Sequence, residues 1–209
     1  MARLLYIQAS PRGARSHSLG AAEAFLTAYR DAHPQDEIVK IDLFQKKMPP
    51  FDGFALQAKY NILHGEDHSE EELAAWRAVE KIIEEFTSAD KYLLATPMWN
   101  FHLPYALKHY IDIIVQPGYT FSYSPEEGYS GLVKGKPVLF VCARGGEYIP
   151  GSEAESFDLQ TRYLETIFGF MGFSDMRKLI VEPTLSDPTS VERIRQEAVE
   201  RARVLAESF

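Results

Sequence analysis

The sequence has little cysteine: Cys142 is the only one, so no Cys-x-x-Cys pair exists. A single cysteine cannot form an intramolecular disulfide, and the missing pair excludes both a cysteine-pair zinc motif and a dithiol redox motif. This usage is typical of the reducing cytoplasm, where we expect the protein to act. Cys142 ends an apolar run and is interpreted as a small buried hydrophobe rather than a nucleophile.

Long apolar stretches and basic clusters are also absent. The first apolar run, Leu4–Ile7, is far shorter than the roughly 20 residues that a membrane span requires, and it leads into a polar loop, so we predict neither a signal peptide nor a membrane segment. The chain carries 30 acidic and 22 basic residues, a net charge of −8, and its basic residues cluster only in pairs such as Lys46-Lys47. A nucleic-acid partner is disfavoured, because clustered cations bind a phosphate backbone.

The composition is that of a globular protein, with 45% apolar and 25% charged residues among 209. No linker, internal repeat or low-complexity tract interrupts the chain. We therefore expect a single domain that comprises residues 1–209.

Short apolar runs bounded by turn residues recur along the chain and are typical of strands buried in a sheet. The runs are Arg3–Ala9, Glu37–Asp42, Lys91–Thr96, Lys136–Cys142 and Arg177–Val181. A β-hairpin is predicted between the third and fourth runs, because Thr120–Tyr123 and Gly131–Val133 are separated by glycine and proline. The sequence thus predicts five strands and a small β-hairpin insertion.

Apolar residues at helical spacing separate these strands and predict helices over 19–29, 73–86, 107–114, 157–171 and 189–207. Ser69 and Glu72 form a capping-box signature before the second helix, and Asp187-Pro188 suits the start of the last one. Residues 43–68 lack clean periodicity and are predicted as a long connection with room for one short helix. Parallel strands need crossover helices, so the alternation predicts a three-layer α/β sandwich.

Ligands of such sheets bind beyond the carboxyl ends of the strands, which makes the loops after the first, third and fourth strands the candidate site. The first loop carries Ser10, Ser16, His17 and Ser18 and opens a helix, so it offers hydroxyls and free N–H groups to a phosphate. It lacks both Gly-x-Gly-x-x-Gly and Gly-x-x-x-x-Gly-Lys-Ser/Thr, which disfavours a Rossmann dinucleotide site and a P-loop. The alternative is that Ser16 or Ser18 merely caps the helix.

The other two loops are aromatic and glycine-rich. The loop after the third strand is Pro97-Met98-Trp99-Asn100-Phe101, and the loop after the fourth is Ala143-Arg144-Gly145-Gly146. Aromatic bulk in a loop suits a flat ring covered by protein, although Trp99 and Phe101 alternatively pin the loop on the core. Paired glycines permit close approach of backbone amides to a ligand, but a Gly-Gly turn alone is weak evidence.

In combination the three loops resemble the FMN-dependent azoreductases of the flavodoxin-like fold, which are relatives of the NAD(P)H:quinone oxidoreductases. The resemblance covers nearly the whole chain, rests on Pro-Met-aromatic-Asn-Phe and Arg-Gly-Gly at successive strand ends, and extends to Tyr163–Gly172. The chain departs from it at His17, where Gln or Asn is common, at Trp99, where Tyr is common, and at Ala143, where Ser is common. These departures leave the backbone contacts available.

The resemblance implies a flavodoxin-like sheet of order 2-1-3-4-5 with FMN bound by the residues of the three loops. It also implies a homodimer with two sites at its interface, each lined by the partner chain. The turnover that the resemblance implies is ping-pong: NADH or NADPH would reduce FMN and leave, and a quinone or azo compound would then take the electrons in the same pocket. No catalytic acid–base pair is required, and the amides around Asn100 and Gly145-Gly146 are expected to stabilise negative charge on reduced flavin.

Three aromatic residues, Phe121, Tyr123 and Phe170, are candidates for the wall of the substrate pocket, although aromatic residues are equally common in cores and dimer contacts. The histidines at 17, 102 and 109 match no metal-ligand spacing, so no metal is predicted.

Two other functions compete with the oxidoreductase. A flavodoxin-type electron carrier would pass electrons to protein partners without a nicotinamide, but the long connection at 43–68 and the hairpin would enclose a substrate pocket that a carrier does not need. A protein that binds another phosphorylated ligand through the serine loop would leave the aromatic loop and the Gly-Gly turn without a shared purpose. The sequence does not encode a readable choice between NADH and NADPH.

Overall fold

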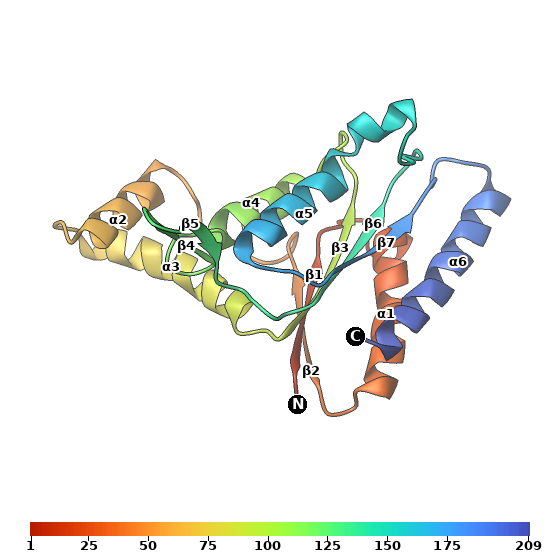
Figure 1. The fold of residues 1–209 in the computed structure, drawn as a ribbon, viewed down its shortest axis with the longest axis horizontal. Coiled ribbons are helices and arrows are strands. Elements are labelled where there is room, and N and C mark those ends of the chain that lie inside the picture. Colours follow the sequence, from red (N-terminus) through yellow and green to blue (C-terminus); the bar gives the residue numbers. More distant parts are fainter.

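A computed structural model describes all of residues 1–209, and a parallel five-stranded sheet organises it (Figure 1). The strand order is β2-β1-β3-β6-β7, which is 2-1-3-4-5 once the hairpin strands are left out, as predicted. The strands are β1 (Arg3–Gln8), β2 (Glu37–Asp42), β3 (Lys91–Pro97), β6 (Val138–Ala143) and β7 (Met176–Val181). All neighbours pair in parallel, so the carboxyl ends of the three central strands meet at one edge.

Helices cover both faces of the sheet, which confirms the three-layer sandwich. One face is covered by α1 (His17–Ala32) and α6 (Pro188–Glu207), and the other by α3 (Glu70–Thr87), α4 (Tyr105–Ile114) and α5 (Leu159–Met171) (Figure 1). The predicted caps form: Ser69 and Glu72 make a complete capping box, and the Asp187 carboxylate accepts hydrogen bonds from the N–H groups of Thr189 and Ser190. No helix is both long and apolar enough to span a bilayer.

Alternation along the central strands divides the apolar residues into two cores. Leu4 and Tyr6 of β1 pack under α1 and α6, whereas Leu5 and Ile7 face the opposite helices. The six residues of β6, VLFVCA, are all buried, because the strand is covered on both faces. Cys142 belongs to this strand and is fully buried, and burial raises the pKa of its thiol to about 12, as expected of a structural rather than a reactive cysteine.

The hairpin begins where the sequence predicts, but its second strand was predicted too late. It pairs β4 (Phe121–Ser124) with β5 (Gly128–Gly131), whereas the prediction put the second strand at Gly131–Val133. Val133 instead donates its N–H to the carbonyl of Met171, which joins the chain to the end of α5. The hairpin ends at Gly131 because a Cβ there would lie 2.3 Å from the backbone of Gly172, so only glycine fits this contact.

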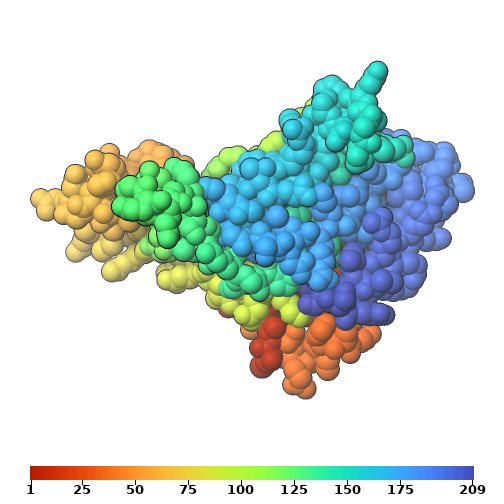
Figure 2. Space-filling view, viewed as in Figure 1, coloured from red at the N-terminus to blue at the C-terminus, as the bar shows by residue number.

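The connection after β2 contains more structure than its sequence indicates. It holds the 12-residue helix α2 (Gly53–His64), which begins with the Asp52 side chain as N-cap and ends at Gly65 in the left-handed conformation. The helix α2 packs on α3, and its residues gather with those of the hairpin at one extremity of the molecule (Figure 2). We call α2 and the hairpin together the arm. Its exposed surface includes Phe54, Leu56, Tyr60, Leu63, Tyr123 and Tyr129.

Candidate functional site

A cavity of about 180 Å³ lies where the carboxyl ends of β1, β3 and β6 meet. Its lining brings all three candidate loops together, with Ser10, Ser16 and His17 from the first, Pro97, Met98 and Trp99 from the second, and Ala143 and Gly145 from the third. The parallel register explains this convergence, because Gln8, Ala95 and Val141 lie side by side in neighbouring strands. Residues separated by more than 130 positions therefore share one pocket.

The first loop supplies polar groups that lack partners within the chain. The hydroxyl of Ser10 is buried and makes no hydrogen bond, and the same holds for Nδ1 of His17. Ser16 is the N-cap of α1, where its Oγ accepts the N–H of Leu19, so the capping role considered from the sequence is real. The Ser16 and Ser18 hydroxyls also contact each other at 3.2 Å. The loop thus presents hydroxyls at a helix N-terminus, an arrangement that binds anions.

The surroundings of His17 favour its neutral form. Burial lowers its pKa below the usual 6.5, and the positive charges of Arg12 and Arg195 lower the pKa further. A neutral imidazole with a free Nδ1 can hydrogen-bond a phosphate, and a bound anion would offset the two arginine charges.

The second loop contains a tight turn in an uncommon backbone conformation. Trp99 and His102 exchange two backbone hydrogen bonds, of 3.0 and 2.9 Å, and the residues between them, Asn100 and Phe101, have φ values of 48° and 66°. Positive φ at both central positions is the signature of a type I′ turn, which usually contains glycine or asparagine, so Phe101 is strained there. The N–H groups of Asn100 and Phe101 donate no hydrogen bond within the chain. The side chains of Trp99 and Phe101 are exposed.

The third loop also leaves amides free. The N–H groups of Gly145 and Gly146 make no hydrogen bond within the chain, whereas their carbonyl side is fixed: the Gly145 carbonyl accepts from Leu185 at 3.1 Å. The Arg144 carbonyl accepts both the N–H and the hydroxyl of Thr184. The glycine amides are therefore held in place without being used by the protein.

The side chain of Arg144, unlike its neighbours Ala143 and Gly145, does not line this cavity. It lines a second cavity of about 270 Å³ beside α5, where it pairs with Asp158. Of the residues predicted for the cofactor, eight line the common cavity: Ser10, Ser16, His17, Pro97, Met98, Trp99, Ala143 and Gly145. The other five, Ser18, Asn100, Phe101, Arg144 and Gly146, do not line it.

Three lining residues, Arg12, Thr184 and Leu185, were not among the predicted site residues. Arg12 belongs to the first loop. Thr184 and Leu185 follow β7, whose carboxyl end lies beside that of β6, so the register would have found them had the loop after the fifth strand been included. Leu185 is 86% exposed, and its side chain lies over Gly145.

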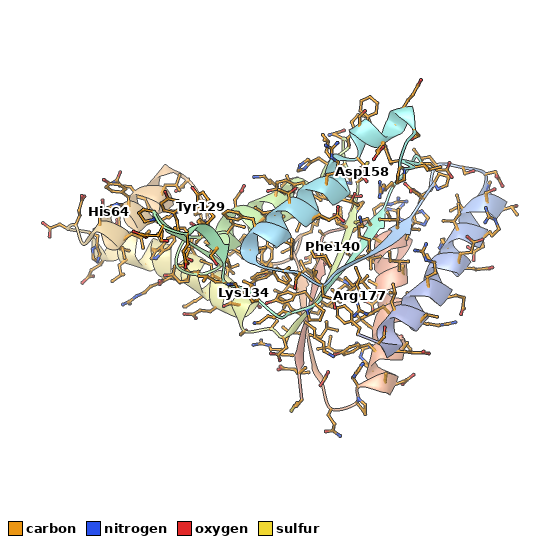
Figure 3. All side chains as sticks on the ribbon, in the orientation of Figure 1. His64, Tyr129, Lys134, Phe140, Asp158 and Arg177 are labelled. Carbon is orange, nitrogen blue, oxygen red and sulfur yellow. The ribbon has the colours of Figure 1, made fainter.

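The three aromatic residues predicted to wall the substrate pocket lie elsewhere in the chain. Phe121 and Phe170 pack with ring centroids 4.7 Å apart, and Tyr129, labelled on the hairpin in Figure 3, joins them and Tyr123. None of these residues lines the cavity. One chain alone therefore does not bring Phe121, Tyr123 and Phe170 to the three loops.

The residues of the cavity fit a flavin mononucleotide. The unpartnered Ser10 hydroxyl and the start of α1 suit its phosphate, and the free amides of the second and third loops suit the polar edge of a flat ring. Exposed Trp99 and Phe101 supply apolar surface for the ring. No group of three or more metal-ligating side chains comes together anywhere in the structure.

Comparison with known proteins agrees with this geometry. Residues 2–205 match the family described as having a flavodoxin-like fold, and the chain belongs to it. It is 51% identical to the FMN-dependent NADH:quinone oxidoreductase of Nitratidesulfovibrio vulgaris, with both chains fully covered, and 45% identical to the enzyme of that name from Desulfotalea psychrophila, covering 100% and 98%.

Solved structures give the same result. An azoreductase from Bacillus anthracis strain Sterne superimposes with a TM-score of 0.92 at 32% identity, with both chains fully covered. An FMN-dependent NADH-azoreductase from the Ames Ancestor strain, solved in complex with FMN, has a TM-score of 0.88 at 29% identity and covers 99% of this chain and 100% of its own.

Proposed function

We propose that this protein is an FMN-dependent NADH:quinone oxidoreductase that also reduces azo compounds. One observation carries the proposal: the hydroxyls at the start of α1, the aromatic loop after β3 and Gly145 with its free amide line the same cavity. Relatives named for this activity match over the full chain, which favours an enzyme over an electron carrier. The names of these relatives specify NADH, and we adopt NADH as the donor.

The protein's own part in the reaction is to bind, orient and shield. FMN, when bound, supplies the capacity to accept a hydride from the nicotinamide and to deliver it to the acceptor. Ser10, Ser16, His17 and Ser18 hold the phosphate, while Trp99 and Phe101 cover the ring and exclude water. The N–H groups of Gly145 and Gly146 donate hydrogen bonds where negative charge develops, which is the role that an oxyanion hole has in acyl transfer.

No side chain needs to act as a general acid or base in this scheme. Donor and acceptor use the same opening in turn, so we expect ping-pong kinetics. Backbone N–H groups make most of the proposed contacts to FMN. The departures from the family pattern at His17, Trp99 and Ala143 are therefore compatible with the function.

The active unit is proposed to be a homodimer in which the partner's arm closes the pocket. The candidate wall residues Phe121, Tyr123 and Phe170 are remote from the cavity of their own chain, and Tyr123 and Tyr129 are 62% and 66% exposed. Large exposed aromatic residues grouped with the apolar surface of α2 suit a protein contact. Each chain, a single domain, would then supply the cofactor loops of one site and the wall of the other.

We place the enzyme in the cytoplasm, where NADH is available and a lone buried cysteine stays reduced. Quinone reduction is the proposed cellular role, because a reduced flavin with an open face reacts readily with quinones.

The test is an anaerobic visible spectrum of FMN-loaded protein before and after addition of NADH or NADPH. We expect NADH to bleach the bound flavin and a quinone to restore its colour. Flavin that binds but is bleached by neither nucleotide would favour the electron carrier, and protein that does not bind FMN would contradict the site itself.

The homodimer is tested by measuring molar mass in solution for the wild type and for Tyr123→Ser. A dimeric wild type and a weakened dimer in the variant are expected. A monomer with full quinone reductase activity would contradict the shared pocket.

A further inference from the structure

Arg144 is a buried cation directly behind the two free amides of the third loop. Only 4% of its side chain is exposed, and its Nη1 donates a 2.7 Å hydrogen bond to Oδ2 of Asp158. Its guanidinium also stacks on the ring of Tyr148, at 5.4 Å from the centroid. A guanidinium this buried needs a charged partner, because an unpaired buried charge is strongly unfavourable.

Asp158 connects this cation to the start of α5, where Figure 3 labels it. It is the N-cap of the helix: its Oδ1 accepts the N–H of Thr161 at 2.9 Å, and its Oδ2 accepts the Thr161 hydroxyl. Burial by itself would raise the pKa of Asp158, but the Thr161 hydrogen bonds and Arg144 outweigh burial and lower the pKa. The carboxylate therefore stays charged and fixed in orientation.

Glu182 holds the other side of the arginine. Its Oε2 lies 3.6 Å from Nε of Arg144 and accepts the N–H of Tyr148 at 3.3 Å. Arg144 thus ties three segments together: the exit of β6, the exit of β7 and the beginning of α5. Its backbone belongs to the amide loop, and its side chain belongs to an ionic cluster formed by Asp158 and Glu182.

We infer that Asp158 is a positioning residue for the flavin: through Arg144 it fixes the direction of the Gly145 and Gly146 N–H groups and thereby favours the reduced form of bound FMN. The inference rests on the proposed function. The Asp158 carboxylate touches neither cofactor nor substrate; it acts through the backbone that its partner carries. Hydrogen bonds aimed at developing charge stabilise it most when their donors cannot reorient.

Two observations distinguish this role from simple structural support. The loop could have been held by its backbone bonds to Thr184 and Leu185 alone, yet it also carries a buried charge that needs a second buried charge. Replacing such a pair by apolar residues is often neutral or stabilising, so stability alone gives little reason for the pair. Arg144 directly precedes Gly145 in the chain, so the ion pair that fixes its side chain also restricts the orientation of the Gly145 and Gly146 N–H groups.

The experiment compares the midpoint potential of bound FMN in wild type, Asp158→Asn and Asp187→Asn by spectroelectrochemical titration. Asn retains an N-cap acceptor in both variants, so only D158N removes a carboxylate that faces an arginine. Asp187 is the matched control, because its Oδ1 also caps a helix, α6, and it has no cation partner. We expect D158N to lose about tenfold in the preference for reduced over oxidised FMN, which for two electrons is about 30 mV toward more negative potential.

A second variant, Arg144→Met, keeps the inference falsifiable should D158N fail to fold. It removes the cation rather than leaving it unpaired, and it is expected to shift the potential in the same direction. Wild-type potential in folded, FMN-loaded D158N, or in R144M where D158N does not fold, would overturn the positioning role, as would an equal shift in D187N. If wild-type protein binds no FMN, the proposed function fails instead, so the two failures are distinguishable.

Discussion

Several polar groups at the amino end of the sheet have hydrogen-bond partners within the chain, whereas others at the carboxyl end have none. At the amino end, the Asp36 carboxylate accepts hydrogen bonds from the N–H of Ala2 and the hydroxyl of Tyr29, at 2.6 and 2.7 Å, and lies 3.6 Å from Lys91. At the carboxyl end, the N–H groups of Gly145 and Gly146 have no partner in the chain. We call the amino end of the sheet, where these polar groups are paired, the closed end, and the carboxyl end, where the glycine amides are free, the open end.

A further hydrogen bond and the positions of backbone strain follow the same division. At the amino end, the Lys136 ammonium donates to the carbonyls of Thr87 and Ala89 at the end of α3, so these carbonyls have partners. The two non-glycine residues with positive φ, Asn100 and Phe101, both lie at the carboxyl end. Unused donors and a strained turn lower stability where they occur, so their concentration at one end marks the part of the molecule shaped for a ligand.

The largest expected effect comes from filling the open end. In Gly145→Val the new Cβ meets the side chain of exposed Leu185, whose Cδ1 and Cγ lie 2.6 and 3.0 Å from the Cβ position. That side chain can move aside, so the fold should survive while the ring surface is obstructed. We expect FMN affinity to fall about 100-fold, equivalent to about 2.7 kcal/mol. Fluorescence titration of FMN measures this, and the circular dichroism melting curve is the control. Unchanged affinity would remove the third loop from the site.

Removing hydrogen bonds at the closed end should lower stability without changing FMN affinity. Asp36→Ala strands the Tyr29 hydroxyl and the Ala2 amide and is expected to lower the free energy of unfolding by about 2 kcal/mol, with FMN affinity unchanged. Urea denaturation and FMN titration check the two halves of this expectation. A loss of FMN affinity as large as that of G145V would contradict the division between the ends.

The pH dependence of stability tests the role of Asp36 at the closed end. The Ala2 N–H and the Tyr29 hydroxyl lower the pKa of Asp36 to about 2 from an ordinary 3.8. A depressed carboxyl pKa contributes stability that is complete above the unfolded pKa and is lost as the pH falls toward the folded one, here from about 4 to about 2. Asp36→Asn should show a smaller loss of stability over this window, measured by urea denaturation at each pH. Parallel curves for variant and wild type would refute the assignment.

Relieving strain at the open end should give a smaller change. Phe101→Gly accepts a φ of 66° without strain but adds freedom to the unfolded chain, so we expect stability to rise by at most about 1 kcal/mol. FMN affinity should fall, because the turn and its aromatic cover are no longer fixed. Val204→Gly, at an exposed position inside α6, is the control and should only destabilise.

The smallest effect concerns His17. Its depressed pKa means that the unfolded chain binds the proton more readily, so wild-type stability should decline as the pH falls below about 6.5. His17→Gln should reduce this decline and match the wild type at pH 8. His102 is the comparison, because burial and Lys108 lower its pKa in the same direction. An unchanged pH profile in H17Q would show that His17 does not titrate as described.

Most of the sandwich was predictable from sequence because its strands are continuous apolar runs and its helices carry periodic apolar faces with caps. The arm was not: α2 buries few residues, Ala55, Ala58 and Asn61, so its apolar pattern is faint, and its exposed aromatics blur the face further. The second hairpin strand was placed too late because nothing in the local sequence indicates that Gly131 lies against Gly172, which is distant in sequence.

The candidate site was predictable as a set of loops but not in its orientation. Strand ends locate the residues, and the parallel register brings them together, which one-dimensional spacing can anticipate. The direction of a side chain is set by its partners: Arg144 turns away from the cavity because Asp158, reached only through folding, lies behind the loop. Thr184 was missed for a different reason: the loop after the fifth strand was not among the candidate loops.

The backbone contact between Gly131 and Gly172 also determines where the sequence can vary. With no space for a Cβ at the base of the hairpin, neither position tolerates diversification, whereas the tip at Pro125–Glu127 is exposed. Libraries confined to the tip would leave the core untouched. Under the proposed dimer this tip belongs to the arm that closes the neighbouring pocket, so a tolerant stretch of three residues becomes the natural place for new acceptor specificities to evolve.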